Sequence, residues 1–441
     1  MKITLFAHGL RGDVWPMISL GWHLAKREHQ VTMAVPGEFQ SLAERAGLRV
    51  VPLPFDMMAW LGAPEGQHLL SRGGAAVLRG LAAEYSRYGE ALDDAHLAAA
   101  QGAEAMVGGM TTIDRAVALG DLQQVPVSMV FQQPAAPSGD FSAPTITRGR
   151  VRSRPLRRAS NHLAYRLWWH GNVAATNRFR RRLGLPRQRK TTFSRMQEHG
   201  AISLHTFSPS LLPRPTDWAD NLKVTAAWQM PSAVRGDLGE ALPDELQSWL
   251  TAGDPPIFLG FGSMPVLDPE AMFDDVLAVT TSLGRRAIVS ENCVPKRVSG
   301  ALPSHLRTVG AVDHDRLFPQ CAAIVHHGGL GSTTASARSG RPTMVCSVFS
   351  DQPWWGELLQ RLGAGVHVPF RKLDRHALSQ GLCTLLDPRV EARAADLGAS
   401  IRSEGDGLPE ATRSLEDWLL TAEPMPLAAS RGVGKIRRPI A

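Results

Sequence analysis

The sequence has no long hydrophobic run and little cysteine. None of its 441 residues fall in an apolar stretch of about 18 residues, the length that a membrane-spanning helix needs. The four cysteines, Cys293, Cys321, Cys346 and Cys383, are widely separated and form no CxxC pair, which argues against a zinc site and a disulfide scaffold. The apolar run Ile3–Ala7 is too short for the core of a signal peptide and predicts a buried strand. We therefore expect a protein of the reducing cytoplasm.

Acidic residues are missing from one long segment. Between Phe141 and Gln197 there is no Asp or Glu, whereas 15 of the 48 Lys and Arg residues lie there, so the net charge of +7 belongs to this segment. A basic nucleic-acid-binding protein usually also carries a recognisable motif, and the sequence has neither a helix-turn-helix signature nor an RNP motif. Residues 148–195 are instead candidates for contact with an anionic inner membrane surface or an acidic acceptor, the alternative being a solvated helical face.

Short β-branched runs alternate with helical stretches, which predicts parallel sheets covered by helices on both faces. The expected strands are 3–7, 31–35, 48–52, 105–107, 127–131 and 201–207, then 257–260, 286–290, 306–309, 322–325, 343–348 and 365–368. Pro, Gly and mixed charge near residues 225–240 separate the two series. We predict doubly wound domains at 1–228 and 236–408, a helix at 409–422 that packs back on the first domain, and a mobile tail at 423–441.

Two predicted helices bear on function. Pro16–Arg27 is expected to be helical, with Pro16 in its first turn. Ser160–Leu183 is expected to be helical with Leu163, Leu167 and Phe179 on its apolar face and the arginines largely outward.

The strongest motif is AAIVHHGGLGSTTASA, residues 322–337. A predicted strand leads into His326, His327 and a glycine-rich turn, after which Ser332 and Thr333 open a helix. Glycines let backbone N–H groups approach an anion closely, and a helix start adds partial positive charge. The motif lacks the Gly-Lys-Ser/Thr of a P-loop and the spacing of the dinucleotide fingerprint. It indicates a phosphate site, the alternative being an ordinary tight turn.

Two further motifs carry carboxylates directly after predicted strands. In SVFSDQPWW, residues 347–355, Asp351 and Gln352 offer the acceptors and the donor that vicinal sugar hydroxyls need; alternatively, Asp351 caps a helix. In HGLRGDVWP, residues 8–16, Asp13 stands at the carboxyl edge of the sheet. There it either deprotonates a hydroxyl as a general base or caps the following helix.

A fourth motif, LGFGSM at residues 259–264, places Ser263 after the first strand of the second series. Ser263 can donate to a phosphate or to the cleft, the alternative being a simple glycine turn. Since the carboxyl ends of parallel strands meet at one edge of a sheet, the four motifs together predict one site between two domains.

At these residues the sequence resembles the GT-B glycosyltransferases of family 1. More narrowly, it is similar to the branch that contains sterol glucosyltransferases, rhamnosyltransferases and the transferases that decorate antibiotic aglycones. The resemblance rests on residues 9–36, 205–215, 259–264 and 309–366. It implies a GT-B fold of two Rossmann-like domains, the first holding an apolar or amphipathic acceptor such as an aglycone, sterol or lipid. The second would hold a UDP- or dTDP-sugar as co-substrate, and the resemblance implies neither a cofactor nor a metal.

Carried over by position, the resemblance makes Asp13 the catalytic base of an inverting transfer. The donor would be bound by Ser263, Val312, His327, Gly329, Gly331, Ser332, Thr333, Asp351 and Gln352. Within this set the glycine-rich loop and Ser263 would hold the diphosphate, and the backbone of Val312 would lie near the base. Asp351 and Gln352 would hold the sugar hydroxyls.

The sequence departs from the plant members of that family at two places. Plant members have His in place of Asp13 together with a helper Asp, whereas residues 106–112, MVGGMTT, contain no acid, so Asp13 would act alone. Plant members also have a ribose-binding Glu where this chain has Ala335. Candidates to line the acceptor pocket, or else to pack in the core, are Trp15, Trp60, Trp168 and Trp169.

Other protein classes share part of this pattern. A GT-B sugar-nucleotide epimerase would bind the same donor but need no acceptor. A non-catalytic helper protein would share the fold without the chemistry, and the presence of Asp13, His327 and the Asp351–Gln352 pair argues against it. The acidic remainder of the chain argues against a nucleic-acid-binding protein.

Overall fold

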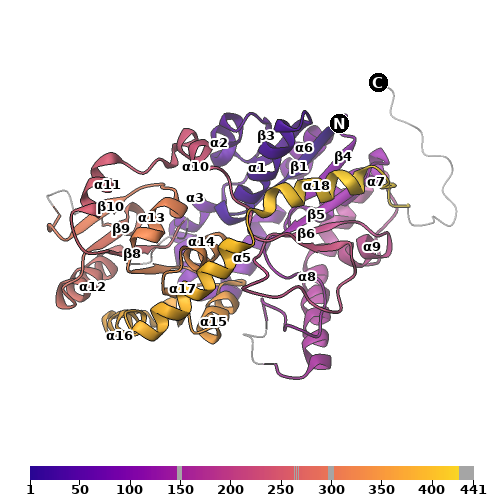
Figure 1. The fold of residues 1–441 in the computed structure, drawn as a ribbon. Helices are drawn as coiled ribbons and strands as arrows, with labels where there is room; N and C mark the ends of the chain where they lie inside the picture. The colour runs from indigo at the N-terminus through magenta and orange to yellow at the C-terminus, as the bar shows by residue number, and fades with distance from the viewer. Residues whose placement is uncertain (147–150, 263, 265, 267, 296–301, 427–441) are drawn as a thin grey trace.

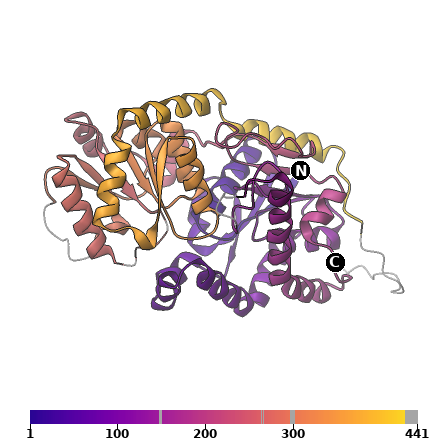
Figure 2. The same ribbon diagram turned by 90° about the horizontal axis from the view of Figure 1, so that it is seen from below.

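The computed structural model describes residues 1–146, 151–262, 264, 266, 268–295 and 302–426. Two α/β domains lie side by side, and the last helices run from the second domain back onto the first (Figures 1 and 2). Each domain is built on one sheet in which every strand pairing is parallel. Within the described ranges, no helix combines the length and the hydrophobicity needed to cross a membrane.

The N-terminal sheet has the strand order β3-β2-β1-β4-β5-β6-β7. Its strands are β1 (Lys2–Phe6), β2 (Gln30–Pro36), β3 (Arg49–Leu53), β4 (Ala105–Gly108), β5 (Val127–Phe131), β6 (Ser203–His205) and β7 (Leu222–Val224). Its helices are α1 (Arg11–Lys26), α2 (Gln40–Arg45), α3 (Met57–Gly62), α4 (Pro64–Ser71), α5 (Gly74–Arg87), α6 (Gly89–Ala100), α7 (Ile113–Gln123), α8 (Arg154–Arg182) and α9 (Thr192–Glu198). The central strands β4 and β5 are buried along their whole length, as expected for a parallel sheet covered on both faces.

The C-terminal sheet has the strand order β10-β9-β8-β11-β12-β13. Its strands are β8 (Ile257–Gly260), β9 (Ala287–Ser290), β10 (Leu306–Val309), β11 (Ala323–His326), β12 (Thr343–Ser347) and β13 (Gly365–Pro369). The helices are α10 (Ser232–Arg235) in the linker, then α11 (Asp244–Thr251), α12 (Pro269–Ser282), α13 (His314–Leu317), α14 (Leu330–Ser339), α15 (Gln352–Arg361), α16 (Arg375–Leu385), α17 (Pro388–Ser403) and α18 (Gly407–Leu419). All the strands predicted from the sequence are present, and β7 is one that the pattern missed.

Helix α1 begins earlier than the sequence pattern predicts. It starts at Arg11 rather than near Pro16, so Pro16 lies inside the helix and Asp13 lies in its first turn. Proline has no N–H to donate to the carbonyl of Gly12, but the loss falls next to the first turn, where few intrahelical bonds are made.

The chain end completes the N-terminal domain. Leu408, Ala411 and Leu415 of α18 are buried in the same apolar cluster as α1, and the Nδ1 atom of His23 lies 2.9 Å from the hydroxyl of Thr412. Part of the predicted mobile tail is instead packed on the domain, because Met425 is also buried, in the apolar core on the other face of the sheet. Residues 427–441 of that predicted tail lie outside the described residues.

Helix α8 corrects the predicted orientation of the basic segment. Leu163 and Leu167, predicted to face inward, are 51% and 56% exposed, whereas Arg180, predicted to face outward, is 1% exposed. Of the three predicted apolar positions, Phe179 alone is buried. The other arginines of α8 lie largely outward, as predicted. The inward turn of Arg180 has an electrostatic cause, which lies on α7.

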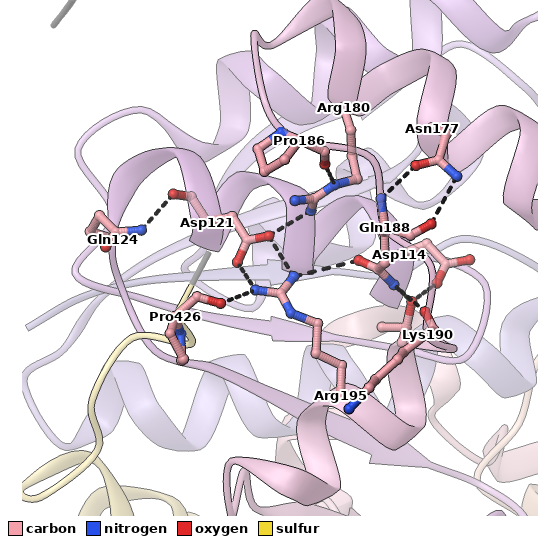
Figure 3. Close-up of polar contacts among 11 residues, drawn as sticks. Asp114, Asp121, Gln124, Asn177, Arg180, Pro186, Gln188, Lys190, Arg195 and Pro426 are labelled. Carbon is pink, nitrogen blue, oxygen red and sulfur yellow. Dashed lines mark hydrogen bonds and ion pairs between the residues drawn. The ribbon is translucent and has the colours of Figure 1, made fainter. Parts of the chain in front are cut away.

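Asp121 of α7 is a buried carboxylate that binds two buried arginines (Figure 3). Its Oδ2 accepts from Arg180 and from Arg195 at 2.5 Å each, and its Oδ1 accepts from the second Nη of Arg195 at 2.6 Å. Arg195 also donates to the carbonyl of Pro426 at 3.0 Å. A charge buried in a protein interior requires such partners. The cluster therefore fixes α8, α9 and the chain end on α7.

We expect Asp121→Asn to destabilise the protein by about 3–5 kcal/mol, because two buried guanidinium groups lose their counter-charge. Asp94→Asn is the matched control: Asp94 pairs with Arg182, and their side chains are 60% and 44% exposed, so its loss costs about 1 kcal/mol or less. Denaturant unfolding of both variants measures the difference. Equal losses for the two variants would contradict the role of the Asp121 cluster.

Candidate functional site

A cleft of about 790 Å³ lies between the two domains. Its walls include Arg11 and Trp15 of α1 on one side and Val312, Gly329 and Ala335 on the other. Loops after β8 and β11 open into it, and these strands are neighbours on either side of the point where the strand order reverses. Ligands of doubly wound sheets bind at such a point, where two loops diverge beyond the strand ends.

Asp13 lies beside this cleft, in the first turn of α1. Its Oδ2 accepts from the backbone N–H of Leu10 at 3.0 Å, so the carboxylate does hold the start of the helix. Burial raises the pKa of Asp13 to about 7, the Leu10 N–H opposes the rise, and the negative charge of Asp351 adds to it. Asp13 therefore combines a contact that holds the helix start with a pKa suited to proton transfer.

Gly9 makes room for that carboxylate. Its φ is +142°, and a Cβ atom there would overlap the Oδ2 atom of Asp13. Gly12, one residue before Asp13, has open space where a Cβ would stand. The turn after β1 therefore needs glycine at position 9, but not at position 12, for the Asp13 carboxylate to keep its position.

Tyr85 of α5 is a neighbour of Asp13 that the sequence analysis missed. Its hydroxyl is buried and has no hydrogen-bond partner among the described residues. Burial, with the charge of Asp13 as the next cause, raises its pKa above the ordinary value. Its ring packs edge-on against His8 at 4.9 Å between centroids. Residues 106–112 supply no acid here; Thr111 of this segment donates to the carbonyl of His8.

The paired histidines of the glycine-rich loop have different environments. His326 is buried; its Nδ1 accepts from the N–H of Gly328 at 2.8 Å and its Nε2 lies 3.2 Å from the hydroxyl of Ser336, so it shapes the loop. His327 lines the cleft, and burial lowers its pKa to about 4, so the ring is neutral at pH 7. A Cβ at Gly329 would come within 2.6 Å of the Nε2 of His327, which explains glycine there.

The start of α14 presents polar groups to the cleft. No side chain caps this end within the part of the chain that the structure describes, which leaves its first-turn N–H groups to a ligand. Gly331, Ser332 and Thr334 line the cleft, whereas Thr333 is fully buried and does not. The hydroxyls of Thr333 and Thr334 both lack a hydrogen-bond partner among the residues described, so the position of Thr334 on the cleft wall distinguishes the two. The structure thus offers Thr334, rather than the predicted Thr333, beside Ser332.

The loop after β12 holds Asp351 and Gln352. Asp351 occupies the N-cap position of α15, but its carboxylate makes no capping bond and instead accepts from the indole N–H of Trp355 at 2.7 Å. Burial raises the pKa of Asp351 above its ordinary value. Gln352 is buried, and its Oε1 accepts from the backbone N–H groups of Val348 and Phe349 at 2.8 and 3.2 Å. Neither side chain is among the cleft-lining residues, although Asp351 acts on the pKa of Asp13.

Val312 and Ser263 are the remaining residues predicted to bind the donor. Val312 lines the cleft next to Gly310 and Ala311. Ser263 lies outside the described residues, and Gly262 immediately before it lines the cleft against the ring of His327.

The chain contains one Asp-x-Asp triplet, Asp313-His314-Asp315, whose carboxylates resemble a metal-binding pair. One Nη of Arg235 lies 2.9 Å from Asp313 and 3.0 Å from Asp315, and Arg338 pairs with Asp315 as well. These arginines neutralise the two carboxylates. Over the described ranges, no group of three or more His, Cys, Asp or Glu residues is placed to hold a metal.

The four candidate tryptophans lie in different places. Trp15 lines the cleft with the Arg11 guanidinium over its ring at 4.5 Å, and Trp60 packs against Phe55. Trp168 and Trp169 line a separate apolar cavity of about 20 Å³, which has room for little more than one water molecule.

Comparison with known proteins identifies the family. Residues 275–410 match the model of the erythromycin biosynthesis protein CIII-like C-terminal domain. The chain is 32% identical over 430 residues to the O-mycaminosyltylonolide 6-deoxyallosyltransferase of Streptomyces fradiae, covering 96% of this chain and 98% of that protein. The chain belongs to the antibiotic- and sterol-type glycosyltransferases. It is also 27% identical over 462 residues to a sterol 3-beta-glucosyltransferase of Arabidopsis thaliana, covering 100% of this chain and 71% of that protein.

Solved structures confirm the GT-B fold of this transferase. The spinosyn rhamnosyltransferase complexed with thymidine diphosphate matches with a TM-score of 0.62 and 20% identity, covering 94% of this chain and 100% of that one. The calicheamicin glycosyltransferase CalG4 matches with a TM-score of 0.62 and 16% identity, covering 96% and 99%. The predicted enzyme class, glycosyltransferase, is confirmed by the relative from Streptomyces fradiae.

We expect Gly9→Ala to lower the turnover of the transferase by about 100-fold, because the added Cβ displaces the Asp13 carboxylate. Gly171→Ala adds the same methyl group in α8, where space is open and the residue does not line the cleft, and should retain near-normal turnover. Sugar transfer to an aglycone that the wild-type enzyme accepts, together with thermal unfolding midpoints, separates a lost site from a lost fold. Equal turnover in the two variants would show that the Gly9–Asp13 contact is unimportant.

Proposed function

We propose that this transferase moves a sugar from a UDP- or dTDP-sugar to a hydroxyl of an apolar or amphipathic acceptor, with inversion at the anomeric carbon. The observation that carries the proposal is the buried Asp13 carboxylate beside an interdomain cleft, with a pKa raised to about 7. A general base works best when its pKa lies near the working pH. The names of its relatives support acceptors of this class, since one acts on a mycaminosylated tylonolide and another on sterols.

In the proposed reaction Asp13 takes the proton of the acceptor hydroxyl while that oxygen attacks the anomeric carbon. The bond between this carbon and the diphosphate oxygen breaks on the opposite face, and the electron pair leaves with the nucleotide. The charge of Asp351 already raises the pKa of Asp13. In the proposed complex one oxygen of Asp351 accepts from the Trp355 indole N–H and the other accepts from a donor sugar hydroxyl. The Oε1 atom of Gln352 already accepts hydrogen bonds from the loop backbone, so in this proposal its amide nitrogen donates to a sugar hydroxyl.

The leaving diphosphate is stabilised by the start of α14. The first-turn N–H groups of Gly331 and Ser332 and the hydroxyls of Ser332 and Thr334 donate to its oxygens, and His327 can donate as a neutral imidazole. The backbone of Val312 lies along the nucleotide base. These donors meet the charge that develops on the leaving group, and we expect transfer to proceed in the presence of a metal chelator.

We expect Asp13→Asn to lower turnover by about 10²–10⁴-fold with a modest change in donor affinity. For the wild-type enzyme, kcat/KM should rise with pH and level off above about pH 7, because the carboxylate acts as a base only after it loses its proton. The variant should lose this dependence. Initial rates across a pH series measure both effects, and near-normal turnover of the variant would exclude Asp13 as the base.

We expect Thr334→Val to weaken binding of the preferred nucleoside diphosphate roughly tenfold or more, because a hydrogen bond to a charged oxygen is lost. Thr333→Val changes a neighbouring hydroxyl that does not line the cleft and should bind normally. Calorimetric titration with UDP and dTDP gives the affinities and the choice of base. If neither nucleotide binds the wild-type protein, the donor site proposed here is wrong.

A further inference from the structure

The outer face of α8 carries a stripe of exposed leucines. Leu156, Leu163 and Leu167 are 63%, 51% and 56% exposed. Their spacing of seven and four residues places all three on one side of a helix. Single exposed leucines are common on protein surfaces, but three aligned on one helix face are a patch that calls for a partner. We call these three residues the leucine stripe.

Positive charge flanks the leucine stripe. Arg166 of the same helix is exposed beside Leu163 and Leu167, and Arg152 is exposed just before the helix begins. The whole segment 141–197 contains no acidic residue. The carboxylates that meet α8 from other elements do so near its ends: Asp140 pairs with Arg154 and the charge of Asp217 interacts with Arg158 near the start, and Asp121 pairs with Arg180 and Asp94 with Arg182 near the end. The outer face of the helix therefore presents aliphatic and cationic groups together.

The opposite face of α8 is anchored in the N-terminal domain. Tyr165 stacks on Phe193 at 4.7 Å between ring centroids, and Trp168 and Trp169 face the small apolar cavity. Arg180 is held by Asp121. In Figure 1 the beginning of α8 projects below the rest of the chain. The leucine stripe is thus presented by a helix that is fixed in orientation.

We propose that α8 docks the N-terminal domain on an anionic lipid bilayer, with the leucine stripe at the boundary of headgroups and acyl chains and the flanking arginines on lipid phosphates. Amphipathic helices that lie in the membrane interface combine these two features. A protein partner is a poorer fit, because interface hot spots are enriched in Trp and Tyr, and the aromatic residues of α8 face inward. The inference goes beyond the proposed reaction and does not depend on its donor or its base.

Co-sedimentation with vesicles tests this docking. The full chain should bind vesicles made of equal parts phosphatidylcholine and phosphatidylglycerol at low ionic strength. It should bind vesicles of phosphatidylcholine alone at least tenfold more weakly, and salt should release it because attraction between exposed charges is screened. No binding of the wild-type protein to the anionic vesicles at low salt would overturn the proposal.

Two variants and two matched controls identify the surface. Leu163→Ser with Leu167→Ser should lower the partition coefficient roughly tenfold or more, whereas Leu420→Ser, at a leucine that is 83% exposed just after α18, should leave it unchanged. Arg152→Gln with Arg166→Gln should weaken binding, whereas Arg389→Gln with Arg413→Gln, two exposed arginines of α17 and α18, should not. Equal losses in variants and controls would overturn the assignment to α8.

Sedimentation velocity without lipid separates the remaining alternative. If the wild-type chain forms a dimer that the two leucine substitutions dissociate, the stripe binds a second copy of the chain, and the bilayer assignment is wrong. A chain whose oligomeric state is the same with and without the stripe, together with the vesicle results above, supports the bilayer. Thermal unfolding midpoints confirm that the surface variants remain folded.

Discussion

Parallel pairing of the strands in both sheets is the constraint on which the site depends. Parallel neighbours all end at the same edge, so the loops after β1, β8, β11 and β12 are carried toward a common cleft. The order of each sheet reverses beside its first strand, which leaves space at β8 and β11 for the glycine-rich loop. The residues proposed for the chemistry therefore lie in loops that follow strands or at the helix starts beyond them, while the buried strands fix where those loops begin.

This dependence also explains what the sequence could and could not predict. Strands buried on both faces appear as continuous apolar runs, which made them visible, whereas β7 is three residues long and includes a lysine. It is harder to predict from the sequence which residues of a helix face the cleft. Because each residue advances about 100° around a helix, the choice between Thr333 and Thr334 depends on where α14 begins. Tyr85 comes from a segment without a motif, and only the fold brings it to Asp13. The inward orientation of Arg180 could not be predicted from the pattern of α8, because its partner Asp121 is distant in the sequence.

The two domains together set the pKa of Asp13. Burial raises the pKa of Asp13, and the charge of Asp351, from the other domain, raises it further. The linker connects the two domains beside the cleft, where Arg235 pairs with Asp313 and Asp315 of the second domain and lies over the ring of Trp15 of the first at 5.6 Å. The domains also meet at Gly74 of α5, where a Cβ would lie 2.9 Å from the side chain of Phe349, two residues before Asp351. A movement that separated the domains would rehydrate Asp13 and return its pKa toward that of an ordinary aspartate.

The return of the chain end to the first domain has a consequence for synthesis and for engineering. The apolar faces of the N-terminal sheet are completed by α18 and Met425, which leave the ribosome after the whole second domain. The first domain therefore reaches its final core only after the second domain has been synthesised, and part of its apolar surface is uncovered until then. A chimera that exchanges the second domain between transferases must accordingly take residues 407–426 from the parent of its first domain.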